Sequence, residues 1–263
     1  MGESIGRRLF MVRAGRGVLA MAVLGAAACS SDGEGGGAAD GSDRTPSPDP
    51  TDPTSSPPET PSDGPADVPD LSWSRVDLGF VSAYVLVRGR EALVVDTGVG
   101  GSADDIGEAL DEAGPGWAGV RHVVLTHKHP DHVGSIGDVA DRAASATLYA
   151  GAPDIDAIDT PRRLRAVGDG DDVLGLQVVA TPGHTAGHVA VFDPGTRVLV
   201  AGDALNNDGR LTGSNPQFTE DEAAAADSVR KLAELEPEVV LVGHGAPVER
   251  NASAQLGQLA RSP

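Results

Sequence analysis

The sequence predicts an α/β fold for residues 71–263 of a chain of 263 residues. Short apolar runs rich in β-branched residues, which are typical of buried strands, alternate there with segments of helical periodicity. Several of these runs end directly in motifs that contain histidine or aspartate. Interleaved strands and helices favour a layered α/β fold, and the motifs place its chemistry at the ends of strands.

Strands are expected wherever a short apolar run is bounded by polar or turn-forming residues. The ranges are 81–87, 92–95, 120–125, 146–150, 176–180, 189–192, 197–201 and 238–242. Residues 88–91 join the first two strands as a hairpin, and the turn at 193–195 joins the pair before the last strand.

Helices are expected over 103–113, 136–144, 220–235 and 252–260. In the first of these, Ile106 and Leu110 lie four residues apart and therefore share one face. Residues 154–172 are acidic and irregular, and no element is predicted there.

Three histidines and an aspartate follow the strand predicted over 120–125. The motif reads Thr126-His127-Lys128-His129-Pro130-Asp131-His132. Alternate side chains of an extended segment share a face, so His127, His129 and Asp131 are expected to point the same way. His132 breaks that alternation, and the spacing therefore suits two neighbouring metals better than one. A lone loop histidine is usually solvated, but clustered histidine and aspartate are what a transition-metal site requires.

Further motifs follow other predicted strands. His184 and His188 come after 176–180, Asp203 follows 197–201, and His244 follows 238–242. Asp96 begins an Asp-Thr-Gly motif after 92–95. Because strand ends tend to carry the chemistry of α/β folds, these residues are candidates for the same site.

In this order and spacing, the motifs resemble the metallo-β-lactamase-fold superfamily, and the segment 181–188 is similar to its glyoxalase II-like members. The resemblance covers essentially all of 71–263. It implies a four-layer αββα sandwich with the site along one edge of its two sheets. It also implies seven metal ligands: His127, His129 and His184 for one metal, Asp131, His132 and His244 for a second, and Asp203 as the bridge.

The implied activity is that of a metal-dependent hydrolase. Two Zn²⁺ ions would hold a hydroxide that attacks the carbonyl of an ester, thioester or lactone in a small-molecule substrate. Asp131 would be the catalytic residue that orients this nucleophile and handles its proton. The same ligands can hold iron or manganese.

Other functions stay open at this point. A single-iron dioxygenase acting on persulfides shares much of the motif set, and a metal-binding lipoprotein without turnover is another reading. A dedicated β-lactamase is disfavoured, because enzymes of the subclass with this histidine set lack the bridging aspartate found at Asp203. The segment Asn206 to Phe218 is expected to be a loop over the site that helps to select the substrate.

Four polar residues near the motifs have weaker signals. His188 is expected to support the site rather than bind metal, and Asp96 either hydrogen-bonds a ligand from behind or shapes a turn. His122 lies inside a predicted strand and fits a buried, hydrogen-bonded histidine. Lys128 lies between two candidate ligands and is expected to be solvated.

Residues 1–29 are predicted to be a signal peptide. Arg7 and Arg8 precede an eleven-residue apolar stretch, a pattern similar to a twin-arginine export signal, with an ordinary secretory signal as the alternative. Cys29, the only cysteine, matches the acylated residue of a bacterial lipoprotein; cleavage after Ala28 and simple secretion compete with this. Lipidation would anchor the protein to the outer face of the cell membrane.

Residues 30–70 are rich in proline, glycine and aspartate and are predicted to be a disordered tether, because they contain almost no bulky apolar side chain. The chain carries a net charge of −19 and has no basic run. Nucleic acid is therefore excluded as an expected partner, and membrane contact is expected only through the lipid anchor. The oligomeric state is not indicated by the sequence.

Overall fold

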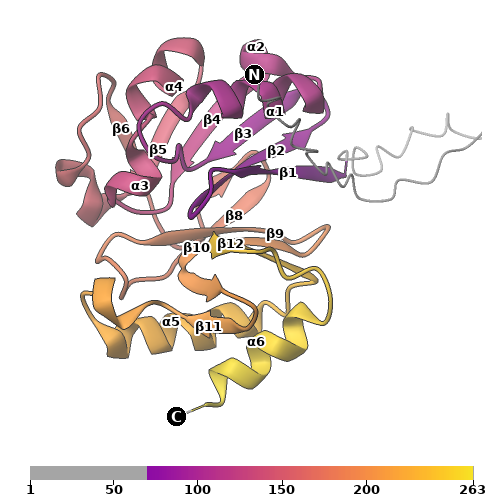
Figure 1. Cartoon of the computed structure of the whole chain (residues 1–263), viewed down its shortest axis with the longest axis vertical. Helices are drawn as coiled ribbons and strands as arrows, with labels where there is room; N and C mark the ends of the chain where they lie inside the picture. The colour runs from indigo at the N-terminus through magenta and orange to yellow at the C-terminus, as the bar shows by residue number, and fades with distance from the viewer. Residues whose placement is uncertain (1–69, 263) are drawn as a thin grey trace, which may run out of the picture. The chain divides into compact units, whose positions relative to one another are not determined.

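The computed structural model describes residues 70–262, and its strands form two six-stranded sheets that pack face to face (Figure 1). Helices cover the outer face of each sheet, so the layers run helix, sheet, sheet, helix. The predicted α/β class and four-layer sandwich are confirmed. The export segment and tether predicted over 1–29 and 30–70 lie outside the described residues, except for Asp70.

The first sheet has the order β1-β2-β3-β4-β5-β6. Its strands are β1 (Leu71–Asp77), β2 (Ser82–Arg88), β3 (Glu91–Val95), β4 (Val120–Leu125), β5 (Thr147–Gly151) and β6 (Leu164–Val167). The first three strands are antiparallel, and β3 to β6 are parallel to one another. The carboxyl ends of β3 and β4, with their Asp96 and His127 motifs, therefore meet at one edge.

The second sheet has the order β11-β10-β9-β8-β7, and β12 pairs with β10 in parallel. Its strands are β7 (Asp172–Val173), β8 (Leu176–Ala180), β9 (Val189–Asp193), β10 (Val198–Asn207), β11 (Leu211–Gly213) and β12 (Val239–Gly245). Because β10 and β12 run in the same direction, Asp203 and His244 come from the same end of the sheet.

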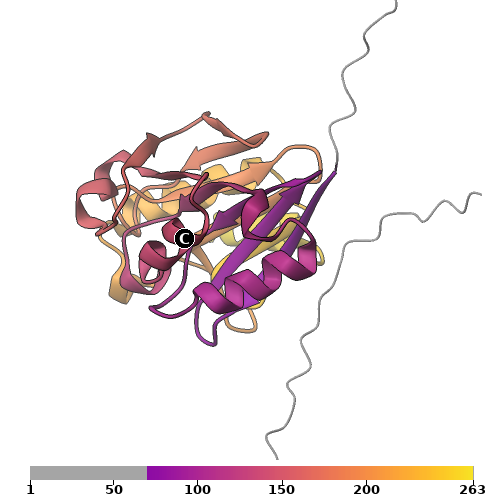
Figure 2. The same cartoon turned by 90° about the horizontal axis from the view of Figure 1, so that it is seen from above.

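Four helices follow strands of the first sheet, and two cover the second (Figure 1). They are α1 (Ala103–Ala113), α2 (Gly116–Gly119), α3 (Pro130–Val133), α4 (Ile136–Arg142), α5 (Glu222–Glu234) and α6 (Ala252–Ala260). Figure 2, seen from above, shows α1 lying over the strands of the first sheet. None of the helices in residues 70–262 has both the length and the hydrophobicity needed to cross a bilayer.

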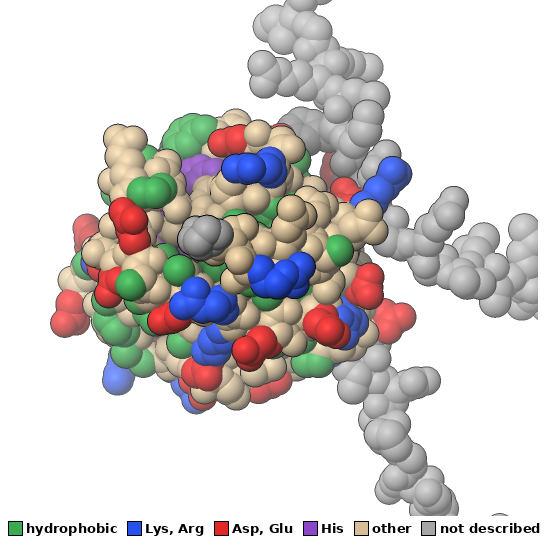
Figure 3. Space-filling model, turned by 90° about the horizontal axis from the view of Figure 1, so that it is seen from below, with side chains coloured by type: hydrophobic (Ala, Val, Ile, Leu, Met, Phe, Trp, Pro, Cys, Tyr) green, Lys and Arg blue, Asp and Glu red, His purple; other side chains and the backbone are tan. Residues whose placement is uncertain are grey.

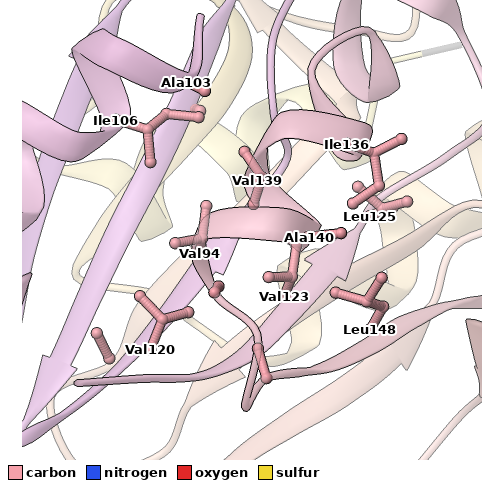
Figure 4. Packing of buried hydrophobic residues seen from close by; sticks show 14 of the residues in the cluster. Val94, Ala103, Ile106, Val120, Val123, Leu125, Ile136, Val139, Ala140 and Leu148 are labelled. Carbon is pink, nitrogen blue, oxygen red and sulfur yellow. The ribbon is translucent and has the colours of Figure 1, made fainter. Parts of the chain in front are cut away.

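Three layers of buried apolar side chains pack the helices and sheets against one another. In the first, Ile136, Val139 and Ala140 of α4 pack on Val123 and Leu148 of the sheet (Figure 4). A second layer fills the space between the sheets, and a third lies between the second sheet and helices α5 and α6. Burial of apolar surface of this kind contributes roughly 25 cal/mol per Å².

One buried hydrogen bond connects the two sheets next to the motifs. The hydroxyl of Tyr84 on β2 donates to the carbonyl of Val242 on β12 at 2.8 Å. Val242 lies two residues before His244, so this bond fixes the position of the end of β12 against the first sheet. The bond thus helps to hold the two sheets together next to the histidine motifs.

The structure corrects two predictions. The strand predicted over 197–201 continues to Asn207, and the predicted loop after it contains β11 and a 3-10 helix, η2 (Pro216–Phe218). The long strand persists because β12 pairs along its whole length, while β9 pairs with its first part and β11 with its last. Local hydrophobicity could not show this, since residues 202–207 are mostly polar or small.

The histidine motif is also not extended throughout. The backbone is extended up to His129 (φ −67°, ψ 145°), and Pro130 then begins the helical turn α3. Proline suits the first turn of a helix because its fixed φ matches and no N–H is needed there. Asp131 therefore does not share a face with His127 and His129, and the expectation from strand alternation is wrong at this residue.

Candidate metal centre

Three imidazoles converge at the ends of β4 and β8. His129 Nδ1 lies 3.0 Å from His127 Nε2 and 2.9 Å from His184 Nε2. His127 and His184 are buried, and His129 is partly exposed. We call these residues the three-histidine group. Its nitrogens approach one another as the donors of a single metal ion do.

A second set of donors lies beside the first. Asp131 and His132 come from α3, and His244 comes from the end of β12. Asp131 Oδ2 lies 3.8 Å from His132 Nε2 and 3.4 Å from His244 Nε2. We call these residues the mixed group. Both Asp131 and His244 are about a quarter exposed, so this group faces solvent more than the three-histidine group does.

Asp203 on β10 reaches both groups. Its Oδ2 lies 3.4 Å from His184 Nε2 and 3.1 Å from His244 Nε2. Its Oδ1 lies 3.3 Å from His132 Nε2. One carboxylate therefore has oxygens within reach of imidazoles from each group. All seven residues predicted to be ligands are brought together, with Asp131 beside His132 and His244 rather than beside His127 and His129.

Asp96 holds the histidine motif from behind. Its carboxylate accepts hydrogen bonds from the Thr126 amide (2.7 Å), the Thr126 hydroxyl (2.8 Å) and His132 Nδ1 (2.8 Å). With Nδ1 donating to Asp96, Nε2 of His132 faces Asp203 and becomes a metal donor when it has lost its proton. Asp96 itself has a φ of 61°, a left-handed conformation that aspartate tolerates better than most residues. It thus supports a candidate ligand from behind.

Other ligand rings have similar partners. The second nitrogen of His184 contacts Ser214 Oγ at 2.9 Å, and that of His244 donates to the Phe80 carbonyl at 2.7 Å. Such contacts fix the tautomer and the orientation of a ligating imidazole. A Cβ at Gly243 would collide with Asp203 Oδ1. Glycine is therefore needed beside His244.

His188 is buried but is not arranged as a ligand. Its Nε2 accepts from the Asp203 amide at 3.1 Å, and its Nδ1 contacts Thr181 Oγ1 at 2.7 Å. Both ring nitrogens are thus engaged with the protein. This agrees with the supporting role expected from the sequence. Burial lowers the pKa of His188 to about 3, so the ring stays neutral.

Sequence reasoning missed Asp154. This fully buried carboxylate accepts from the Lys128 amide (3.1 Å), the Thr185 hydroxyl (2.6 Å) and the Gly187 amide (2.9 Å). It thereby joins the loop that carries His127 and His129 to the loop that carries His184. Its acidic, irregular surroundings in the sequence offered no signal, because its partners are 26 to 33 residues away.

Lys128 and His122 were expected from the sequence to lie outside the set of metal ligands. The Lys128 ammonium forms a 2.7 Å ion pair with Glu220 and remains partly exposed. His122 is partly buried on β4 and contacts the hydroxyl of Tyr149 at 3.3 Å. Neither residue belongs to the groups of candidate ligands.

The two groups differ in electrostatics. Burial holds the pKa of His127 well below its ordinary value and lowers the pKa of His184 to about 4. Burial also acts to lower the pKa of His132, but the carboxylates of Asp96 and Asp203 raise it well above its ordinary value. The hydrogen bond to Asp203 raises the pKa of His244. The lowered pKa values of His127 and His184 thus contrast with the raised pKa values of His132 and His244.

The donor set fits bound metal. His132 Nε2 and Asp203 Oδ1 are buried and have no hydrogen-bond partner in the described residues. A buried polar atom without a partner costs about 1–3 kcal/mol, and such atoms are rare in folded proteins. Both atoms face the other candidate ligands. Metal coordination would satisfy them.

A pocket of about 610 Å³ opens over the ligand atoms. Its lining includes the candidate ligands His129, Asp131 and His244 together with the exposed Phe80 and Phe218. The surface seen from below mixes acidic and basic side chains, and a histidine is visible at its margin beside hydrophobic side chains (Figure 3). The site is thus open to a small molecule.

Comparison with known proteins identifies the family. The sequence model of the metallo-β-lactamase superfamily matches residues 76–244, which include every candidate ligand. The chain belongs to the metallo-β-lactamase superfamily. The resemblance inferred from the motifs is confirmed, and this superfamily member is a metal-dependent hydrolase with a small-molecule substrate.

Individual relatives agree with this family. The chain is 31% identical to the probable metallo-hydrolase YflN of Bacillus subtilis over 214 residues, which cover 64% of this chain and 81% of that protein. It is 30% identical to a hydroxyacylglutathione hydrolase of Dechloromonas aromatica, covering 60% of this chain and 58% of the relative. The crystal structure of TTHA1623 in a di-iron-bound form superposes with a TM-score of 0.56 at 27% identity, covering 69% and 92% of the two chains.

Proposed function

We propose that this protein is a two-zinc hydrolase that cleaves an ester, thioester or lactone. The carboxylate of Asp203 carries the proposal, because its oxygens lie within 3.4 Å of imidazoles from both ligand groups. A bridging carboxylate between two complete donor sets suits two metals better than one. This favours the hydrolase over a single-iron dioxygenase.

Zinc is proposed because imidazole and carboxylate donors suit it, although iron or manganese fits the same donors. The His127, His129 and His184 nitrogens would hold one ion, and Asp131, His132 and His244 the other. When bound, two such ions supply Lewis acidity and bring the pKa of a water molecule toward neutrality. The protein residues then have to place the substrate carbonyl and move protons.

Asp131 is the residue best placed for proton transfer. It lines the pocket, and its side chain is 27% exposed, whereas Asp203 is buried between the two groups. Asp131 would orient the attacking water, take its proton and return one to the leaving group. Asp96 and His188 would keep His132 and Asp203 in place while this occurs.

Metal content and turnover of the full chain test this proposal. Mass spectrometry of protein prepared without added metal should find about two zinc per chain. A chelator should abolish hydrolysis of a panel of esters, thioesters and lactones, and zinc should restore it. One iron per chain with little zinc, or no turnover by fully loaded protein, would contradict the proposal.

We also propose export with acylation at Cys29, on the basis of the sequence alone. The basic segment, the apolar stretch and the cysteine support it. Labelling of the full chain with radioactive palmitate in a bacterial host should be lost in Cys29→Ala. Equal labelling of both proteins, or none of either, would contradict the lipid anchor.

A further inference from the structure

Two phenylalanines at the mouth of the pocket are unusually exposed. Phe80 is 64% exposed and Phe218 is 57% exposed, and they are the large hydrophobic side chains most open to solvent in residues 70–262. Both line the same pocket although 138 positions separate them in the chain. Exposed apolar surface gathered at one site indicates binding of an apolar group.

Each phenylalanine is connected to a ligand of a different group. The Phe80 carbonyl accepts the hydrogen bond from His244, and its ring stacks parallel to that imidazole with an interplanar angle of 11°. Phe218 ends a 3-10 helix whose next residue, Thr219, contacts Ser214, and Ser214 contacts His184. Both phenylalanines are therefore connected through short chains of contacts to the candidate metal ligands.

The charged side chains that line the pocket are histidines and acids. Asp131 and Asp203 are candidate ligands, and Asp208 is the third acidic residue of the lining. Neither lysine nor arginine is among the described residues that line it. Lys128 is paired with Glu220, and Arg210 is exposed on the β10–β11 turn outside the lining.

We propose that the substrate places an apolar group between Phe80 and Phe218 and carries no negative charge away from the scissile bond. This proposal rests on the proposed hydrolase function and narrows it to uncharged or cationic esters, thioesters or lactones. A carboxylate beside the metals would compete with the scissile carbonyl for coordination. A remote carboxylate would meet Asp208 and no cation, so conjugates of glutathione, with two carboxylates, are poor ligands.

Binding of two non-hydrolysable thioethers tests the effect of ligand charge in the absence of any reaction. S-hexyl-N-acetylcysteamine and S-hexylglutathione share the apolar group, and only the second has carboxylates. Calorimetric titration of the zinc-loaded full chain should show the glutathione conjugate binding at least about tenfold more weakly. Equal or tighter binding of S-hexylglutathione overturns the proposal, and so does failure of both compounds to bind.

Substitutions of exposed residues test which side chains cause the difference in affinity between the two thioethers. Phe80→Ala and Phe218→Ala should each weaken S-hexyl-N-acetylcysteamine by about tenfold, because apolar burial is lost. Asp208→Lys should strengthen S-hexylglutathione by about fivefold, and the matched control Asp105→Lys on the distant helix α1 should not. Arg210→Ala should change neither affinity. Selective loss of glutathione binding in Arg210→Ala would overturn the proposal.

Turnover distinguishes this inference from the function on which it rests. Protein that binds the thioethers as expected but hydrolyses no ester, thioester or lactone retains the pocket and refutes the hydrolase. If the protein hydrolyses S-hexanoylglutathione faster than S-hexanoyl-N-acetylcysteamine, the hydrolase function stands and the proposed substrate preference is wrong. The two results cannot be confused, because the first is the absence of turnover and the second is a preference among substrates that are turned over.

Discussion

The three-histidine group and the mixed group lie side by side but are built differently. The first consists of imidazoles from the loops after β4 and β8, and His127 and His184 among them are buried and have lowered pKa values. The second contains a carboxylate, has imidazoles with raised pKa values, and includes the partly exposed Asp131 and His244. We expect from this difference that the first group retains metal more firmly and that the second meets the substrate.

The largest effect is expected from His127→Ala. Loss of this buried donor removes the three-histidine group as a metal site, and kcat/KM should fall by at least about a thousandfold. Zinc counted by mass spectrometry should fall below two per chain. His122→Ala is a matched control on the preceding strand and should keep both zinc and activity. Retained activity in His127→Ala would contradict the assignment.

His244→Ala should affect only the mixed group. Zinc is expected to fall from two to one per chain, and kcat/KM by about a hundredfold, because His127, His129 and His184 still hold one ion. Metal analysis and kinetics on the same preparation test this. If His244→Ala lost both ions, the two groups would not be separable in the way proposed.

Asp96→Asn should weaken metal binding without removing a donor. Replacing the carboxylate behind His132 is expected to lower zinc affinity by about 10–100-fold, more at the mixed group than at the three-histidine group. Competition with a fluorescent chelator measures both affinities. A larger loss at the three-histidine group would show that Asp96 acts mainly through Thr126 instead.

The smallest expected effect is a difference in pH dependence. The raised pKa values of His132 and His244 mean that a proton must leave before metal binds there, so affinity falls as pH drops through them. The pKa of His184 is about 4 and that of His127 is also lowered, so protons compete less at that group. During dialysis at falling pH, the mixed group should release zinc first. Simultaneous release would contradict the comparison.

Much of the local structure could be predicted from periodicity. The ranges predicted for α1, β4, β8 and α6 coincide with those observed. Their apolar residues repeat with helical or strand spacing inside the element itself. By contrast, β1, β6 and β7 were not predicted, since they are edge or very short strands that depend on neighbours distant in the chain.

The seven candidate ligands could be selected from the sequence, because histidine and aspartate motifs at strand ends can be recognised locally. The family resemblance already implied how they divide between the two groups, and the fold shows what places Asp131 beside His244. Pro130 begins a helical turn that directs Asp131 toward His244, 113 positions away. Asp154 and the Phe80–Phe218 pair were equally hidden, since each acts through residues distant in sequence. Only the packing of the two sheets brings such residues together, and local periodicity does not predict that packing.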